Sequence, residues 1–187
     1  MKAIKKNYVC GIAYKDVKKV YKLKSYNHWR HLIERCNNTK KLIENPCYEK
    51  CTICKEWLTF SNYKTWFDNH YVEGWVIDKD LFSNGKKIYS PDTCCFIPVE
   101  LNTFLASLTK RKRTVFIGTG VRYEKGKYYA KIKCCKKTIH LGVFNTLEEA
   151  EKAYKIAKKQ SLHALIEKYK DKLGKQVIDK LLELKFE

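Results

Sequence analysis

Acidic, basic and amide side chains recur over residues 75–102 between short apolar segments. An expected strand carries Asp78-Lys79-Asp80, a polar loop follows at 83–87, and a second strand is expected to open with Tyr89-Ser90-Pro91. The helix expected next carries Asn102 in its first turn. Carboxylate and amide oxygens are the ligands that hard divalent cations prefer. The layout suits metal-dependent phosphodiester chemistry, with one ligand on a strand and a second on the facing helix.

The segments around this motif are predicted to alternate helices with short strands. A helix over residues 25–36 is expected to be capped by Ser25. Residues 37–50, which include Pro46, are expected to form a loop. The other expected elements are a β-like piece at 8–13, a helix over 61–70, a strand over 75–81 and a helix from Val99, with Trp29, Trp57 and Trp66 in the core.

Basic residues dominate the composition: 39 Lys and Arg oppose 20 Asp and Glu, a formal net charge of +19 on 187 residues. Such an excess implies a polyanionic partner, with nucleic acid as the first candidate and an anionic membrane surface as the second. Hydrophobic residues make up 44% of the chain, which is enough to bury a core. The sequence shows neither a long apolar run for a membrane span nor an apolar signal segment near its start. We therefore expect a cytoplasmic protein without a membrane partner.

Three strands and a helix are predicted in the second half of the chain, over 115–123, 128–134 and 137–143 and then from a capping box that joins Thr146 to Glu149. Alternation along the second strand separates a basic face from an apolar one. The first face carries Tyr129, Lys131 and Lys133, and the second carries Tyr128, Ala130 and Ile132. The apolar face can pack on the helix, and the basic face suits the major groove of DNA.

The flanks of this region carry two further features. Before it stands a run of four positive charges, expected to be an exposed linker that also contacts phosphates, at Lys110, Arg111, Lys112 and Arg113. After it, apolar residues at helical spacing from Leu162 to Glu187 indicate two helices separated by Gly174. This apolar stripe either packs internally or forms a homodimer.

Several motifs in order resemble the Apetala-two/ERF-type DNA-binding domain over about 118–159. They are Gly-Val-Arg-Tyr at 120–123, Lys-Tyr-Tyr-Ala-Lys-Ile at 127–132, Ile-His-Leu-Gly-Val-Phe at 139–144 and Thr-Leu-Glu-Glu-Ala-Glu-Lys-Ala-Tyr at 146–154. The resemblance implies a three-stranded antiparallel sheet that lies in the major groove and is backed by one helix. It makes candidate contacts to double-stranded DNA of Arg122, Tyr129, Lys131 and Lys133, with His140 as a weaker one.

Residues 26–104 resemble phage-encoded HNH-type endonucleases, which often carry an Apetala-type domain after the nuclease domain. The residues that carry the resemblance are Tyr26, Trp29, Arg35-Cys36, Tyr48, Cys54, Glu56-Trp57, Phe60, Trp66, Asp78-Lys79-Asp80, Tyr89-Ser90-Pro91, Thr93-Cys94 and Asn102. The resemblance implies a ββα-metal site in which Asp78 and Asn102 hold Mg²⁺ or Mn²⁺ and Lys79 contacts the scissile phosphate. Asp80 points to the other strand face and is expected to be structural or to cap the loop.

The general base of such a site is not fixed by the motif. A standard HNH site has a histidine where this chain has Lys79, and an unperturbed lysine is a poor base at neutral pH. The candidates for the base are His70, His28, His31 and Tyr89. We rank His70 first because it lies just before the strand that carries Asp78.

Nine cysteines in a chain expected to be cytoplasmic indicate thiols or metal ligands and not disulfides. Cys47, Cys51 and Cys54 form the closest cluster, and a structural Zn²⁺ there would need Cys36 or His31 as its fourth ligand. The alternative is that Cys54 packs as a small apolar side chain before Trp57.

Together these patterns predict an α+β protein with an HNH-like nuclease domain over 1–109 and an Apetala-type domain with a helical extension over 110–187. The expected activity is metal-dependent endonuclease cleavage of DNA, in the cytoplasm of a phage-infected host cell. The alternative is a DNA-binding protein or transcription regulator without catalysis, because Lys79 replaces the usual histidine.

Overall fold

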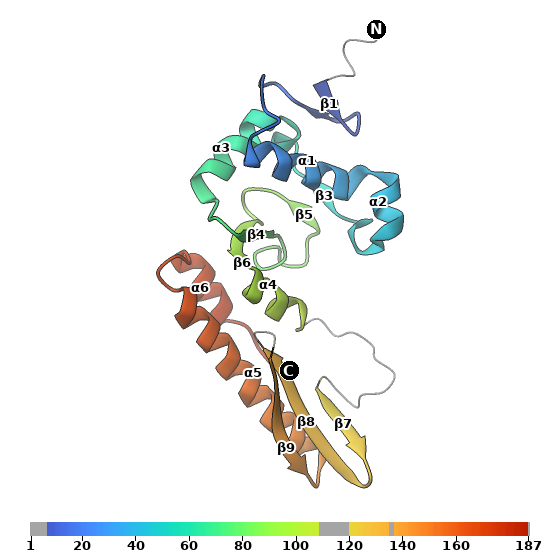
Figure 1. Cartoon of the computed structure of the whole chain (residues 1–187), viewed down its shortest axis with the longest axis vertical. Coiled ribbons are helices and arrows are strands. Elements are labelled where there is room, and N and C mark those ends of the chain that lie inside the picture. Colours follow the sequence, from blue (N-terminus) through green and yellow to red (C-terminus); the bar gives the residue numbers. More distant parts are fainter. Residues whose placement is uncertain (1–6, 109–119, 135–136, 187) are drawn as a thin grey trace. The chain divides into compact units, whose positions relative to one another are not determined.

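The computed structural model describes residues 7–108, 120–134 and 137–186 (Figure 1). The chain divides into two units, Met1–Phe96 and Ile97–Glu187. Each unit combines helices with small sheets, so the α+β class is confirmed. Among the described helices, none has the length and apolar character that a membrane crossing requires.

The first unit is built from many short elements. In chain order they are β1 (Tyr8–Val9), β2 (Ala13–Tyr14), α1 (Lys24–Asn37), α2 (Thr39–Glu44), η2 (Pro46–Tyr48), β3 (Thr52–Ile53), η3 (Glu56–Leu58), α3 (Phe60–His70), β4 (Trp75–Asp78), β5 (Ile88–Tyr89) and β6 (Cys95–Pro98), the last of which continues into the second unit.

Two predictions about the first helices are wrong in detail. Helix α1 begins at Lys24, so its N-cap is Leu23, and Ser25 is buried inside the first turn and does not cap it. The expected loop over 37–50 contains α2 and η2. Helix α2 can start immediately after α1 because the Asn38 side chain accepts the backbone N–H of Lys41 at 3.2 Å and caps it.

Aromatic side chains from α1, η3 and α3 fill the core of the first unit, as the sequence predicts. The Trp29 indole N–H donates to the Trp57 carbonyl oxygen at 2.7 Å, so its polar atom is satisfied inside the core. The Trp57 and Trp66 rings lie 4.6 Å apart between centroids. Burial of these rings sets how α1 and α3 pack, since large aromatic side chains dominate core energetics.

The strand pairing around the motif differs from the expected hairpin. Strand β4 pairs with β6, whereas β5 pairs with β3 in parallel, Thr52 opposite Ile88. The segment that begins at Tyr89 is therefore not the second strand of the motif; that strand is β6. Strand β5 ends at once because Ser90 and Thr93 form a turn, in which the Ser90 N–H donates to Thr93 Oγ1 at 3.1 Å.

The second unit is a three-stranded sheet with helices. Its elements are α4 (Val99–Ala106), β7 (Val121–Glu124), β8 (Lys127–Cys134), β9 (Lys137–Phe144), α5 (Leu147–Tyr169) and α6 (Lys175–Leu182). The antiparallel order is β7-β8-β9, and α5 runs along one face of the sheet (Figure 1). The predicted sheet backed by a helix is confirmed, although the start of the expected first strand, over 115–119, lies outside the described residues.

Local signals in the sequence position these elements correctly. Thr146 and Glu149 form the predicted capping box at the start of α5, and Gly174 caps α6 after the break. The faces of β8 alternate as expected: Ala130 and Ile132 are buried, whereas Lys131 is exposed. Apolar residues of the C-terminal stripe are buried within the single chain, among them Leu162, Leu165, Leu173, Val177 and Leu181. Internal packing therefore accounts for the stripe, and a homodimer stays a prediction.

Candidate functional site

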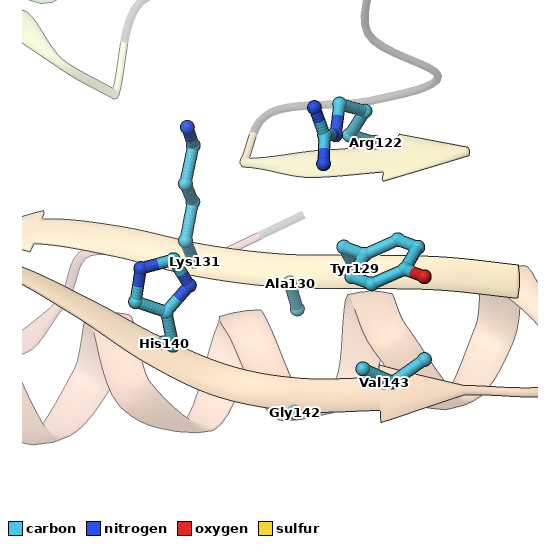
Figure 2. A pocket seen from close by; sticks show the side chains of 7 residues that line it. All are labelled: Arg122, Tyr129, Ala130, Lys131, His140, Gly142 and Val143. Atoms are coloured by element: carbon cyan, nitrogen blue, oxygen red, sulfur yellow. The ribbon is translucent and has the colours of Figure 1, made fainter. Parts of the chain in front are cut away.

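The face of the sheet turned away from α5 presents the side chains expected to contact DNA. Figure 2 shows Arg122, Tyr129, Lys131 and His140 rising from this face, whereas Ala130 points toward the helix behind it. They line a shallow hollow of about 210 Å³. We call this surface the open face. The expected DNA contacts on β7 and β8 thus share one surface.

Strand register places the open-face residues beside one another. Arg122 lies opposite Tyr129, and its guanidinium carbon is 5.5 Å from the centre of the Tyr129 ring. The same guanidinium forms an ion pair with Glu124, two residues along β7. These two contacts restrict the position of the guanidinium, whose planar fork suits hydrogen bonding to a base edge or a phosphate. The sequence does not predict the ion pair with Glu124, because the first strand is expected to end at residue 123 and β7 includes Glu124.

A β-bulge shapes the centre of the open face. Ala130 lies opposite Gly142, but Lys131 lies opposite His140, so Leu141 is the extra residue of β9. Leu141 packs into the core against α5. The shift brings His140 next to Lys131 on the open face (Figure 2). Gly142 adopts a φ of 139°, which residues other than glycine rarely accept, so a glycine inside the expected strand is a signal for such an irregularity.

The remaining expected DNA contacts are Lys133 and the basic run before the sheet. Lys133 continues the exposed alternation of β8, opposite Thr138. The basic run at Lys110, Arg111, Lys112 and Arg113 lies outside the described residues. Its contact with the DNA backbone stays a prediction.

Asp78 ends β4 and holds the loop that follows. Its Oδ1 accepts the backbone N–H groups of Asp80 at 3.0 Å and Leu81 at 2.9 Å. These bonds turn the chain, so the strand stops at Asp78 and does not continue to Leu81 as expected. Burial raises the pKa of the Asp78 carboxyl, although the two N–H donors act in the opposite direction. Asp78, and not Asp80, is the carboxylate that caps the loop.

Lys79 is buried beside Asp78, with 7% of its surface exposed. Its ammonium forms an ion pair with the exposed carboxylate of Asp80 and lies 5.7 Å from the centre of the Tyr89 ring. Burial opposes the charged form, but the hydrogen bond to Asp80 prevails and raises the pKa of Lys79. Lys79 is therefore a fixed positive charge and not a base.

Tyr89 is buried and contacts two cationic side chains. Its hydroxyl oxygen accepts a hydrogen bond from Arg35 at 3.2 Å, and the Lys79 ammonium lies over its ring. Burial raises the pKa of the Tyr89 phenol far above neutral pH, so the neutral phenol is the favoured form there. The guanidinium of Arg35 also lies 5.1 Å from the centre of the Tyr48 ring. In the sequence, Arg35 is only one of the residues of the HNH resemblance, and its contact with Tyr89 is not predicted.

The three candidate histidines have distinct surroundings. The Nδ1 of His70 donates to the Trp66 carbonyl oxygen at 2.7 Å, and its ring stacks on the Trp66 indole. His28 packs against aromatic rings, including Phe67, and burial lowers its pKa. His31 is exposed and lies 3.3 Å from an Arg30 nitrogen. In the part of the chain that the structure describes, no hydrogen bond or ion pair joins any of the three to Asp78 or Lys79.

The expected metal ligands lie in different units. Asp78 belongs to the first unit and Asn102 to the second, where it is half-buried in the first turn of α4. Joint coordination of one ion by these two residues stays a prediction. Over residues 7–108, 120–134 and 137–186, no three His, Cys, Asp or Glu side chains are grouped to hold a metal.

Burial favours the neutral thiol at three cysteines of the proposed zinc cluster, Cys36, Cys51 and Cys54. Cys51 Sγ lies 3.9 Å from the Cys47 carbonyl oxygen, which suits a weak S–H donor. Burial raises the pKa of Cys36 to about 12 and also raises the pKa of Cys51 and Cys54. Zinc would need thiolates, so it would have to overcome this preference for the neutral thiol.

Comparison of the chain with models of known protein families, with curated proteins and with solved structures finds no match.

Proposed function

We propose that this chain is a metal-dependent DNA endonuclease whose second unit binds double-stranded DNA through the open face. The observation that carries the proposal is the gathering of Arg122, Tyr129, Lys131 and His140 on one side of a three-stranded sheet. A sheet of this width fits the major groove, and the net charge of +19 favours a polyanion. We call this the binding half of the proposal.

The catalytic half of the proposal rests on the first unit. Lys79 and Arg35 both lie at Tyr89, the first over its ring and the second at its hydroxyl, and Lys79 directly follows Asp78 in the chain. A phosphate that displaced the exposed Asp80 carboxylate would meet the Lys79 ammonium directly. Fixed positive charge at that point stabilises the charge that develops on a phosphate during hydrolysis.

A divalent cation fits the chemistry of Asp78. Its Oδ1 is committed to two backbone N–H groups, and among the described contacts no hydrogen bond engages Oδ2. Mg²⁺ or Mn²⁺ would be held by Asp78 and Asn102, and when bound would stabilise the leaving oxygen.

His70 is proposed as the general base. The bond from its Nδ1 to the Trp66 carbonyl keeps a proton on that nitrogen and leaves Nε2 as the acceptor. Stacking on Trp66 restricts the orientation of the ring. In this tautomer Nε2 is the nitrogen that can take a proton from water.

The test is plasmid cleavage in Mg²⁺ or Mn²⁺. Asp78→Asn keeps an oxygen for the two loop N–H groups but removes the charge, so cleavage should disappear while the fold and DNA affinity stay unchanged. His70→Ala should reduce turnover by about 10²–10⁴-fold. The matched control is Asp68→Asn, an exposed carboxylate paired with Lys64, which should cleave like the parent protein. Full activity of Asp78→Asn would refute the catalytic assignment.

A second candidate function is DNA binding without catalysis. Two observations favour it: Asp78 already serves as the loop cap, and Lys79 is already neutralised by Asp80. This alternative predicts duplex binding with no nicking in any divalent cation. The same plasmid assay, run beside a binding assay on the same DNA, separates the two functions.

A further inference from the structure

Lys158 is a buried lysine in the second unit. It lies on α5 one turn after Tyr154, and only 3% of its surface is exposed. Its ammonium donates to the Ser107 hydroxyl and lies 4.6 Å from the centre of the Phe104 ring and 5.7 Å from that of Tyr154. These contacts hold the ammonium in place without neutralising it.

The charge of Lys158 has no acidic partner among the described residues. Other lysines of the second unit do have one: Lys168 pairs with Glu100, and Lys180 pairs with Glu183. A buried charge is costly unless it is paired. Burial accordingly lowers the pKa of Lys158, and the two aromatic rings compensate for only part of the lost hydration.

A hollow of about 120 Å³ opens at this lysine. Its charged lining consists of Lys155, Lys158, Lys185 and Glu151, which sum to a local charge of +2 (three lysines less one glutamate). Ser107 lies at the same hollow, and its hydroxyl donates to the Phe104 carbonyl oxygen at 2.6 Å. Because the hydroxyl proton is used in that bond, the serine oxygen is left to accept the hydrogen bond from the Lys158 ammonium.

We propose that this hollow is a binding site for a phosphate group, with Lys158 as its central ligand and Lys155 and Lys185 at its rim. A phosphate monoester carries about −1.5 to −2 charge at neutral pH, which matches the local charge of +2. The hollow has room for a phosphate group, since about 10–15 Å³ of such volume already holds one water molecule. The site is distinct from the open face, because the two hollows share no lining residue. The proposal does not depend on nuclease activity.

The first experiment measures binding of inorganic phosphate to the full chain by calorimetry, at an ionic strength held constant with sodium chloride. Lys158→Met removes the charge but keeps an apolar side chain against Phe104, so the fold should survive. Affinity should fall about ten- to a hundredfold, the scale of one hydrogen bond to a charged group. Lys155→Met, an exposed position that cannot disturb the core, should also weaken binding.

The matched control is Lys159→Met. Lys159 is exposed on the same helix but does not line the hollow, so its replacement should leave phosphate affinity unchanged. Absence of phosphate binding by the parent protein would overturn the proposal. So would equal affinities for Lys158→Met and Lys159→Met.

A second experiment identifies the source of the phosphate. A single-stranded oligonucleotide with a 5′-phosphate is compared with the same oligonucleotide without it. Preference for the phosphorylated strand, lost in Lys158→Met, assigns the site to nucleic-acid ends. Equal binding of both strands, together with Lys158-dependent binding of inorganic phosphate, assigns it to free phosphate.

Discussion

Gly120 is the position at which a single methyl group should do most damage to the open face. Its φ is +85°, and a Cβ there would lie 2.5 Å from Cδ2 of the Tyr154 ring and 2.8 Å from the Lys131 carbonyl oxygen. The left-handed conformation costs a non-glycine residue about 1–2 kcal/mol. Overpacking adds about 1–3 kcal/mol. Gly120→Ala should therefore reduce the free energy of unfolding by about 2–5 kcal/mol.

The matched control is Gly126→Ala, in the turn between β7 and β8. Gly126 has a φ of +76°, but a Cβ there would meet nothing within 4 Å. It should incur only the conformational cost of about 1–2 kcal/mol. The difference between the two variants then measures the collision with Tyr154 and with the backbone of β8.

Urea denaturation followed by far-UV circular dichroism measures both variants. Gly120→Ala should also weaken duplex binding, because the Gly120 carbonyl accepts the Lys131 N–H at 2.9 Å and so fixes the open face. Truncating Tyr154 to leucine in the Gly120→Ala background should recover part of the lost stability. Equal destabilisation by the two glycine variants would refute the packing argument.

Three other predictions concern the open face and the first core. Lys131→Ala should flatten the log–log dependence of DNA affinity on salt by about 0.9, the value for one phosphate contact, and an unchanged slope in a fluorescence-anisotropy titration would remove this contact. Glu124→Gln should tighten duplex binding at low salt in the same assay, because it frees Arg122 and removes a charge that repels phosphate; weaker binding would contradict this. His28 has a lowered pKa in the folded state, so the stability it contributes is complete above its unfolded pKa of about 6.5 and is lost as pH falls below it. His28→Phe should flatten this acid limb of thermal stability, and an identical limb in both proteins would show that another group is responsible.

The sequence by itself determines the features that depend on near neighbours along the chain. The capping box of Thr146 and Glu149, the helix break at Gly174 and the alternating faces of β8 were all predictable. Each follows from a period or a contact within a few residues, which composition and spacing record directly. For the same reason the basic face at Lys131 was predictable without any tertiary information.

The tertiary structure alone decides which strands pair and which charges are buried. Pairing of β5 with β3 joins residues 88 and 52, and no local pattern selects between that partner and the expected one. Lys158 looks like any lysine of a basic helix in the sequence, yet packing against Phe104 buries it. The loop cap is likewise Asp78 and not the expected Asp80, because the loop N–H groups converge on Asp78. Burial and hydrogen-bond partners are set by residues distant in the chain, and these set the pKa and the chemistry of each side chain.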